Sequence, residues 1–318
     1  MNMTAIEKTS KKPRRKRGGI YRTRQLQLYS LCVIPVLVVF VFKYLPMGGL
    51  VIAFKNYRYN KGIWGSDWVG LENFKFFFRT SEFANITWNT LYMNFLFIVI
   101  GIAASVLTAI ALFRLTNRIS VKVYQTALII PHFFSWVVVS YMLYAFLNVR
   151  YGVMNNFLSR IGINPIDWYS TPWPWPVIFV IASLWKHLGM DCVVYYAALM
   201  GIDTSLIEAG EIDGASKRQI MRHIIIPSLV PLITIMTILK IGNIFRADFG
   251  LFYQLPRDSG ALYSTTDVVD TYIFRAMREI GDMGMSAAVG LLQSLVGMVL
   301  VLITNTLSKK VDPDTALF

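Results

Sequence analysis

Long apolar runs separated by short polar segments define the pattern of this chain. Six of these runs are long enough to cross a bilayer, which takes about 20 mostly apolar residues. We predict membrane spans at about residues 25–46, 88–113, 121–147, 174–200, 226–247 and 284–307. Because backbone N–H and C=O groups in lipid must be satisfied internally, runs of this length are predicted to be helices. The predicted fold class is all-α, a polytopic membrane protein with six transmembrane helices.

A basic leader, residues 1–24, precedes the first run, and we assign residues 25–318 to one six-span transmembrane domain. A basic leader followed by a short apolar core is also typical of a signal peptide. Here no small-residue cleavage site follows, since the chain continues Lys43-Tyr44-Leu45-Pro46, so an uncleaved first span is expected. The dense basic cluster at residues 11–17 could bind lipid or nucleic acid, or could simply anchor the topology from a flexible tail.

The composition excludes whole classes of protein. Hydrophobic residues make up 55% of the chain and charged residues only 15%, with a mean hydropathy of +0.50. Soluble domains carry about 25% charged residues, and disordered chains are richer still in charge. The net charge of +13 could indicate nucleic acid, but the charges lie at the ends of apolar runs. They therefore indicate membrane topology, and no nucleic-acid partner is expected.

The distribution of lysine and arginine predicts the orientation of the spans. Of 31 such residues, 17 lie in the leader, in 114–122, in 202–223 and in the tail, and 11 lie in 55–87, 148–172 and 243–282. Segments with more Lys and Arg stay in the cytoplasm. We therefore expect both termini and the loop 202–224 to be cytoplasmic. The aromatic-rich segment 55–87, with Trp64 and Trp68, is expected at the outer interface.

The loop 202–224 has the pattern of two short helices joined by a rigid turn. Ser205-x-x-Glu208 and Ser216-x-x-Gln219 fit capping boxes that would open the two helices. Gly214 lies between them and can take a positive φ, which would end the first helix. The loop is therefore predicted to be a preorganised elbow able to transmit force. The Glu208 carboxylate could serve the capping box alone, or could also contact another protein.

This loop resembles the conserved cytoplasmic loop of ABC importer permeases. The matching residues are Glu208-Ala209-Gly210, Asp213-Gly214-Ala215 and Ile224-Ile225-Ile226-Pro227, with Gly210 where the family has Ala and Ile226 where it has Leu. The segments Lys43-Tyr44-Leu45-Pro46-Met47 and Trp68-Val69-Gly70-Leu71-Glu72-Asn73-Phe74 are similar to carbohydrate permeases of the polysaccharide and aldouronate subgroup. The resemblance covers nearly the whole chain after the leader.

The resemblance implies the type I permease fold, alternating access and a multi-subunit importer in the bacterial inner membrane. The elbow residues Glu208, Ala209, Asp213, Gly214 and Ala215 would couple the chain to a separate ATPase. The implied partners are a second related permease chain, two ATPase subunits, an extracytoplasmic solute-binding protein, an oligosaccharide and membrane lipid. ATP and Mg²⁺ would be held by the ATPases.

The chain itself has no recognisable catalytic chemistry. No G-x-x-x-x-G-K-[ST] phosphate loop occurs in the sequence. The three histidines and two cysteines form no catalytic triad, no metal-ligand spacing and no disulfide framework. We expect a transport subunit without catalytic residues, metal or cofactor of its own.

Charged groups inside the spans indicate the substrate path, because a charge near the middle of a bilayer costs about 2.5–3.5 kcal/mol or more. In the fourth span Asp191 follows His187 by one helical turn, so the two share a face and could instead form a local ion pair. Arg246 could instead extend to the membrane boundary, and the aromatic residues of the third span could serve packing alone. The candidate path residues are His132, Trp136, Ser183, Lys186, His187, Lys240, Asn243 and Arg246.

Basic groups beside aromatic rings suit an acidic oligosaccharide, such as a uronate chain. Aromatic rings stack on the C–H faces of sugars, and carboxylates bind Lys, Arg or His. The alternatives are an ion-coupled secondary transporter, with His187 and Asp191 as a proton relay, and a membrane-embedded enzyme or signalling subunit. The first leaves the elbow without a role, and the second needs a constellation that the sequence lacks.

Overall fold

The computed structural model describes residues 29–79 and 81–311, so the basic cluster at residues 11–17 lies outside the described residues. The chain divides into two units, residues 1–51 and 52–318. An apolar helix, Tyr29–Phe54, begins in the first unit. Its later turns are wound as the π-helix η1 (Phe40–Tyr44) and the 3₁₀-helix η2 (Leu45–Phe54).

The second unit is built on four long apolar helices. These are α4 (Phe83–Phe113), α8 (Trp175–Met200), α11 (Ile226–Gly242) and α15 (Met283–Val311). The helix of α11 starts earlier, at Lys217, because α10 (Lys217–Ile220) and the π turn η4 (Met221–Ile225) lead into it without a break. With Tyr29–Phe54, five helices in the described part of the chain are long and apolar enough to cross a membrane.

The third predicted span is two helices rather than one. It consists of α5 (Arg118–Ile129) with the 3₁₀ turn η3 (Ile130–Phe133), followed by α6 (Trp136–Leu147), and the two parts are bent by 98°. Phe134 and Ser135 between them are extended, with ψ of 134° and 151°. The hydroxyl of Ser135 accepts the backbone N–H of Val138 and so starts the second helix afresh. Hydropathy alone could not reveal this break, since both halves are apolar.

Helix α11, which corresponds to the fifth predicted span, ends at Gly242, before the boundary of residue 247 that hydropathy predicted. Tertiary hydrogen bonds replace the helical ones after this point. The amide of Asn94 on α4 donates to the carbonyls of Ile244 and Arg246, at 2.8 and 3.1 Å. The amide of Gln293 on α15 donates to Phe245 O at 2.7 Å. Lys240 therefore lies on the helix, whereas Asn243 and Arg246 lie on the turn that follows it.

Short elements connect the long helices. They are β1 (Lys55–Asn56), α2 (Gly62–Gly65), β2 (Asp67–Trp68), α3 (Glu72–Arg79), α7 (Val153–Arg160), α9 (Thr204–Ile212), α12 (Phe249–Gln254), η5 (Gly260–Leu262), α13 (Tyr263–Thr266), α14 (Val269–Arg275) and η6 (Ala276–Ile280). Strands β1 and β2 form a small antiparallel hairpin, with Lys55 opposite Trp68. Trp64 and Trp68 in this segment are exposed, as an interfacial position requires.

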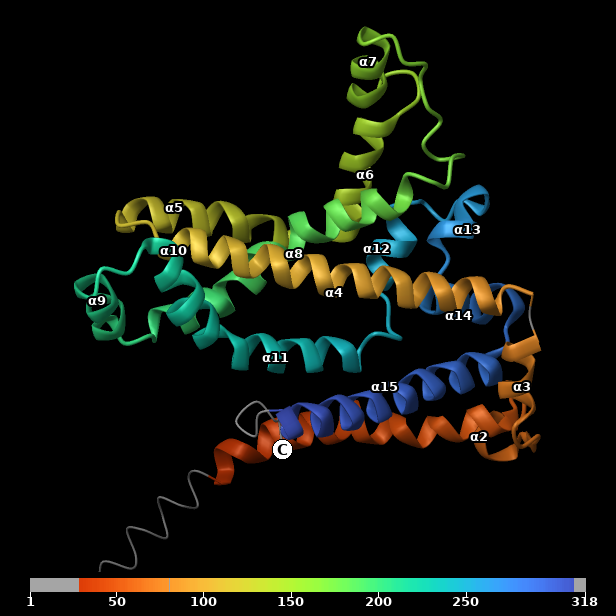
Figure 1. The fold of residues 1–318 in the computed structure, drawn as a ribbon. Coiled ribbons are helices and arrows are strands. Elements are labelled where there is room, and N and C mark those ends of the chain that lie inside the picture. Colours follow the sequence, from red (N-terminus) through yellow and green to blue (C-terminus); the bar gives the residue numbers. More distant parts are fainter. Residues whose placement is uncertain (1–28, 80, 312–318) are drawn as a thin grey trace, which may run out of the picture. The chain divides into compact units, whose positions relative to one another are not determined.

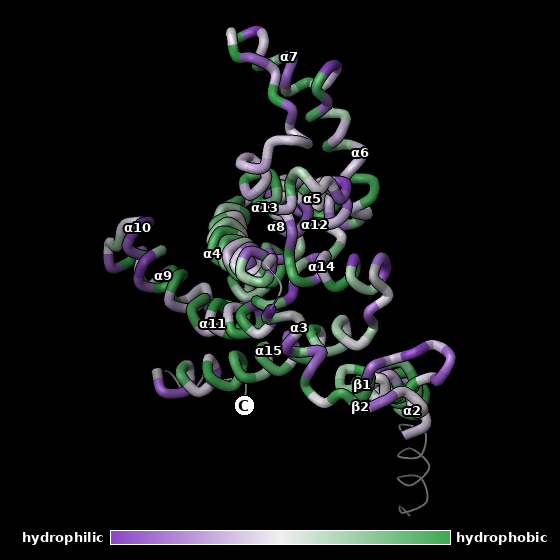
Figure 2. Tube along the Cα trace, turned by 90° about the vertical axis from the view of Figure 1, so that its right-hand side faces the viewer, coloured by the Kyte–Doolittle hydropathy of each residue, from purple (hydrophilic) through white to green (hydrophobic). Residues whose placement is uncertain are grey.

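Packing between the long helices is concentrated on α8. Helices α4 and α5 both run along α8, and α15 packs against α11 (Figure 1). One core cluster surrounds Trp175, Phe179 and Phe252, and a second joins α4, α8 and the α10–α11 helix around Tyr195 and Leu229. In Figure 2 helices α4 and α15 are largely green, whereas α7 carries polar positions. The first core joins α8 to α12 and η5, and the second joins α8 to α4 and to the α10–α11 helix.

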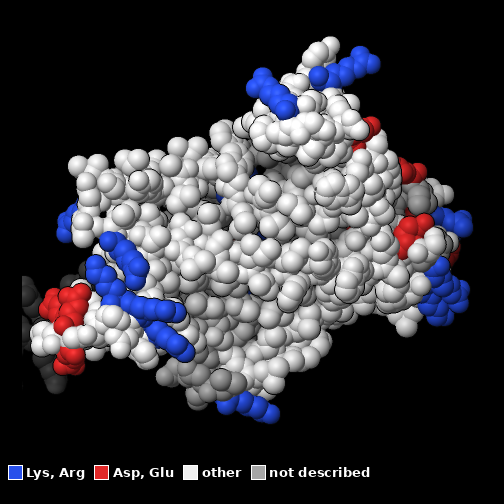
Figure 3. Space-filling view, turned by 45° about the horizontal axis from the view of Figure 1, so that its top comes forward, with Lys and Arg blue, Asp and Glu red and all other residues white. Residues whose placement is uncertain are grey.

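Charged side chains gather at the margins of the face shown in Figure 3, and a broad uncharged surface lies between them. Many side chains of the long helices are large, apolar and exposed, for example Val99 and Leu107 on α4. Such a surface is unfavourable in water and suits contact with lipid tails or with another membrane chain.

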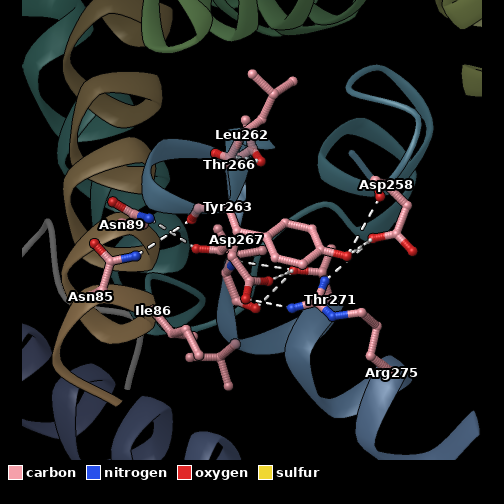
Figure 4. Close-up of polar contacts among 12 residues, drawn as sticks. Asn85, Ile86, Asn89, Asp258, Leu262, Tyr263, Thr266, Asp267, Thr271 and Arg275 are labelled. Atoms are coloured by element: carbon pink, nitrogen blue, oxygen red, sulfur yellow. Dashed lines mark hydrogen bonds and ion pairs between the residues drawn. The ribbon is translucent and has the colours of Figure 1, made fainter. Parts of the chain in front are cut away.

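A polar network ties the first turns of α4 to the segment 258–275 (Figure 4). Asn89 donates to the carbonyls of Ser264 and Asp267, at 3.1 and 3.0 Å. The guanidinium of Arg275 pairs with the carboxylates of Asp267 and Asp258. Burial raises the pKa of the Asp267 carboxyl, and hydrogen bonds from Thr271 and Arg275 oppose that shift. The network fixes the end of the unit opposite the elbow.

Replacing Asn89 by Ala should destabilise the chain by about 1–3 kcal/mol, because two backbone carbonyls lose their donor inside the protein. The melting temperature of the protein in detergent measures the loss. Asn85→Ala is the matched control, since Asn85 is exposed and makes a single long bond of 3.4 Å to Tyr263 O. Equal melting temperatures for the two variants would contradict the role given to Asn89.

Candidate functional site

The elbow begins with a capped helix. The carboxylate of Asp203 accepts the backbone N–H of Ser205 at 2.9 Å and caps α9. This bond holds the pKa of the Asp203 carboxyl below its usual value. The predicted capping box of Ser205 and Glu208 is therefore wrong. An Asp two residues before Ser205 takes the cap, since a carboxylate is at least as good an N-cap as a hydroxyl.

The turn of the elbow is a Schellman motif centred on Gly214. Gly214 has a φ of +78°, as the sequence predicted. The N–H of Ala215 donates to Gly210 O at 2.9 Å, and the N–H of Gly214 donates to Glu211 O at 3.1 Å. This pair of bonds satisfies the last carbonyls of α9 and fixes the direction of the chain. The predicted rigid turn is confirmed in its geometry.

The second half of the elbow opens with the predicted capping box. Ser216 Oγ accepts from the N–H of Gln219 at 3.4 Å, and Gln219 Oε1 accepts from the N–H of Ser216 at 2.7 Å. The helix that starts here continues into α11, so the elbow is joined to a long helix without a flexible link. Ile220 and Ile225 of this helix are buried against α4 and α8.

Glu208 lies on the exposed part of α9, and no capping bond uses its carboxylate. In the described residues it has no ion-pair partner either. Ala209 is exposed beside it, and Asp213 is exposed at the end of α9. A hollow of about 290 Å³ lies between α9, α10 and the end of α4, lined in part by Arg114, Glu211 and Lys217. The elbow therefore exposes polar groups on its outer part.

Two hollows bring most of the candidate path residues together. The α4–α8 cavity, of about 80 Å³, is lined by Phe97, Ile100, Gly101, Ser105, Val180, Ser183, Leu184, His187, Leu188, Asp191 and Lys240. The α4–α11 groove, of about 320 Å³, is lined by Asn94, Phe97, Ile98, Met236, Leu239, Lys240, Asn243 and Arg246. Phe97 and Lys240 line both, so the two hollows meet at these side chains.

Lys240 is held by a carboxylate from another helix. Its Nζ lies 2.8 Å from Asp191 Oδ2, and both side chains are about one-third exposed, at 35% and 33%. His187 and Asp191 share a face, as predicted, but they do not form the local ion pair that the sequence allowed. The partner of Asp191 comes instead from α11, which only the tertiary structure could place there.

Arg246 has no carboxylate partner within the described residues. Its Nη2 donates to Ser294 Oγ on α15 at 2.8 Å, and the side chain is otherwise exposed. Asn243 is also exposed, and its amide donates to Leu239 O. The α4–α11 groove is thus lined by a guanidinium that makes no direct ion pair in the described residues and by the aromatic ring of Phe97.

His132, Trp136 and His187 form an aromatic group at the break of the third span. The ring of His187 lies 5.8 Å from that of His132 and 6.0 Å from that of Trp136. The indole N–H of Trp136 donates to Asp248 at 2.8 Å, and Asp248 lies 3.8 Å from His187 Nε2. The sequence suggested these residues one by one, and the fold assembles them.

Lys186 does not line either hollow. It is buried, and its ammonium group donates to the carbonyls of His132 and Phe134. The geometry therefore separates it from the candidates that line the hollows and places it beside His132 and Trp136, which also line neither. Lys186 and His187 are adjacent on α8 and point in different directions, and only His187 lines the α4–α8 cavity.

Several residues of the site escaped sequence analysis. Asn94, Gln293 and Ser294 are single polar residues in apolar runs, and they hold the turn and the guanidinium of Arg246. Ser105 is buried in the wall of the α4–α8 cavity, and its hydroxyl has no partner in the described part of the chain. Their isolation in lipid-like sequence is the signal that could have indicated them.

Comparison with known proteins agrees with this geometry. The profile of the binding-protein-dependent transport system inner membrane component family matches residues 98–315, which include the elbow and both path helices α8 and α11. The chain belongs to this family. It is a permease component of a sugar or oligosaccharide ABC importer, an inner membrane protein and not an enzyme.

Two relatives from Bacillus subtilis (strain 168) are similar over almost their whole length. The polygalacturonan/rhamnogalacturonan transport system permease protein YteP is 34% identical over 94% of this chain and 93% of its own. Protein LplB is 33% identical over 92% of this chain and 91% of its own. The predicted all-α permease fold is confirmed by a solved structure, and the described residues hold five candidate spans, or six if the bent pair counts as one. A chain in the crystal structure of a bacterial alginate ABC transporter, in complex with alginate pentasaccharide-bound periplasmic protein, superposes with a TM-score of 0.81 at 29% identity, covering 93% of this permease and 98% of that chain.

Replacing Gly214 by Ala should loosen the elbow of this permease. A Cβ at a positive φ costs about 1–2 kcal/mol, which corresponds to roughly a 5- to 30-fold faster opening of the last turn of α9. Amide hydrogen exchange over residues 205–216 measures that opening. The control is Gly210→Ala, where the added Cβ meets the flexible end of Ile224 at 3.3 Å and Ile220 at 3.6 Å, and the φ is not positive. Unchanged exchange in the Gly214 variant would contradict the assigned turn.

Proposed function

We propose that this permease imports an acidic oligosaccharide, of the uronate-containing kind, by alternating access. The observation that carries the proposal is the pair of cations in the α4–α11 groove. In the described residues Arg246 donates to a hydroxyl and makes no direct ion pair, with the Asp270 carboxylate near enough to interact with its charge. Lys240 is paired with the carboxylate of Asp191. A sugar carboxylate entering the groove would find a charge-assisted donor in Arg246, and such bonds are among the stronger ones in proteins.

Aromatic and amide groups beside the cations suit the rest of a sugar. Phe97 lines both hollows and can stack on the C–H face of a pyranose ring. Asn94 and Asn243 offer amide groups to hydroxyls in the same groove. The aromatic group of His132, Trp136 and His187 continues the polar surface toward α6. This combination favours a charged carbohydrate over an inorganic ion or an apolar compound.

Several relatives belong to transport systems for acidic compounds, which supports an acidic cargo. YteP is described as transporting polygalacturonan and rhamnogalacturonan, and a second solved relative is described as importing the acidic polysaccharide alginate. The UgpA permease of Escherichia coli, at 28% identity, belongs to a transport system for sn-glycerol-3-phosphate, which is also an anion. The shared feature of these cargos is negative charge.

We further propose that the elbow faces the cytoplasm and docks on an ATPase subunit. Glu208 and Ala209 would form the contact, and Asp213, Gly214 and Ala215 would hold the turn. A second related permease chain, two ATPase subunits with ATP and Mg²⁺, and an extracytoplasmic solute-binding protein would complete the importer. Motion of the ATPases would pass through the rigid elbow into α11, because no flexible link separates the two. The lysine and arginine distribution supports this orientation, with both termini cytoplasmic.

The ion-coupled alternative gains no support from the family. Its proton relay required His187 and Asp191 to exchange a proton, but the Asp191 carboxylate is bonded to Lys240.

The assembled importer in proteoliposomes provides the main test. Uptake of a uronic oligosaccharide should exceed uptake of a neutral one of equal length, and substrate-stimulated ATPase activity should follow the same order. Equal responses, or a preference for the neutral sugar, would overturn the acidic assignment.

Replacing Arg246 by Gln should raise KM for the acidic oligosaccharide about 10- to 100-fold, because a hydrogen bond to a charged group contributes about 1.5–3 kcal/mol. Neutral sugars should be unaffected. Arg160→Gln is the matched control, since Arg160 is exposed on α7 and lies outside both hollows. A loss of the same size for both sugars would argue against recognition of the carboxylate by Arg246.

Replacing Glu208 by Lys should leave the permease folded and inserted but uncouple ATP hydrolysis from transport. The reversed charge lies on the exposed part of α9, where it affects docking and not packing. ATPase activity and uptake measured on one preparation give the coupling ratio, with Glu279→Lys on η6 as the charge-matched control. Wild-type coupling in the Glu208 variant would count against the docking role.

A further inference from the structure

Lys186 is a buried cation without a carboxylate partner in the described part of the chain. Lys186 lies on α8 and is only 8% exposed. It lines neither the α4–α8 cavity nor the α4–α11 groove. A lysine inside a span is costly unless its charge is solvated by polar groups. The function proposed above gives it no role, so the contacts of its ammonium group must account for its presence.

Those contacts are carbonyl oxygens at the break of the third span. In a continuous helix, the carbonyls of His132 and Phe134 would accept the N–H groups four residues later, those of Trp136 and Val138. The break removes this arrangement, and the N–H of Val138 donates to Ser135 Oγ instead. Lys186 Nζ donates to His132 O at 3.1 Å and to Phe134 O. Freed carbonyls in an apolar layer need such a donor.

We propose that Lys186 is a positioning residue, whose ammonium group holds the broken third span in its bent form. The ammonium group has three N–H donors, and two of them satisfy the two carbonyls exposed by the 98° bend. The carbonyl dipoles in turn stabilise the buried charge. The lysine and the break thus depend on each other, and a lysine on α8 links the two parts of the third span.

The Lys186 ammonium group and the carbonyls of His132 and Phe134 are called the clamp here. The clamp also orients the aromatic group next to the hollows. Lys186 Nζ lies 5.0 Å from the centre of the Trp136 ring, a cation–π distance. Trp136 donates to Asp248, and Asp248 Oδ1 caps α12 by accepting the N–H of Leu251. The fit is tight at Gly250, where a Cβ would lie 2.3 Å from Trp136 Cδ1. A shift of the break would therefore move Trp136 and the start of α12.

A second contact holds the same pair of elements next to the clamp. Gly189, three residues beyond Lys186 on α8, lies so close to α5 that a Cβ would be 2.1 Å from Leu128 O. This close approach brings the end of α5 within reach of a lysine side chain. The clamp is thus part of the packing of α8 on the third span and is independent of the charge of the cargo.

Hydrogen exchange on the assembled importer tests the clamp directly. In K186M, which keeps the length of the side chain but has no donor, amides of residues 130–140 should exchange at least tenfold faster than in the wild type. K186R, which can donate to both carbonyls, should restore most of the protection. K240M is the matched control, because it removes another intramembrane ammonium group that does not touch the break. K186L, which also lacks a donor, gives the same measurement if K186M fails to assemble.

Transport kinetics separate positioning from direct binding of substrate. If Lys186 positions the break, K186M lowers kcat for acidic and neutral oligosaccharides by the same factor, and K186R rescues it. A selective rise in KM for the acidic sugar, as expected for R246Q, would instead make Lys186 a substrate ligand and overturn the proposal. Wild-type exchange at residues 130–140 in K186M and in K186L would also overturn it. Neither outcome depends on whether the acidic-cargo proposal holds, since that rests on the comparison of sugars in the wild type.

Discussion

Every backbone N–H and C=O group in the apolar part of this permease needs a partner from the protein. Regular helices supply such partners within themselves, and this requirement explains why α4, α8 and α15 are long and unbroken. The informative places are those where a helix stops. At the bend between η3 and α6, Lys186 takes two freed carbonyls. After Gly242, donors from α4 and α15 satisfy the carbonyls of the turn.

The same requirement places the polar groups that can meet a substrate. The turn after α11 points Asn243 and Arg246 into a groove because it no longer follows the helical path. The bend of the third span brings His132 and Trp136 beside His187 on α8. A chain of unbroken helices would leave these side chains on separate faces. The irregular backbone thus assembles the polar hollows. Side-chain donors that satisfy the freed carbonyls offset the free-energy cost of the broken helices.

In the elbow, the backbone groups at the helix ends find their hydrogen-bond partners locally. Asp203, the Schellman bonds around Gly214 and the capping box of Ser216 all join residues within five positions of each other. Local caps keep the elbow rigid without help from the spans, while Ile220 and Ile225 attach it to them. A rigid connector with exposed carboxylates on its outer part would suit the docking on an ATPase subunit proposed above. The elbow therefore relies on local hydrogen bonds for its rigidity, whereas the breaks in the long helices rely on long-range ones.

The sequence by itself determined the class of the protein, its apolar helices, the turn at Gly214 and the cap at Ser216, because composition, hydropathy and short-range caps act over a few residues. It also indicated most of the polar residues that line the two hollows, since a polar group in an apolar run is conspicuous. It placed the cap of α9 on the wrong residue, since Asp203 and Ser205 are nearly equivalent as caps. Only the tertiary structure decided that the third span is bent, that Asp191 pairs with Lys240, and that Lys186 faces a neighbouring backbone. These features depend on which helices lie side by side, and partners 49 to 54 residues apart in the sequence leave no local pattern.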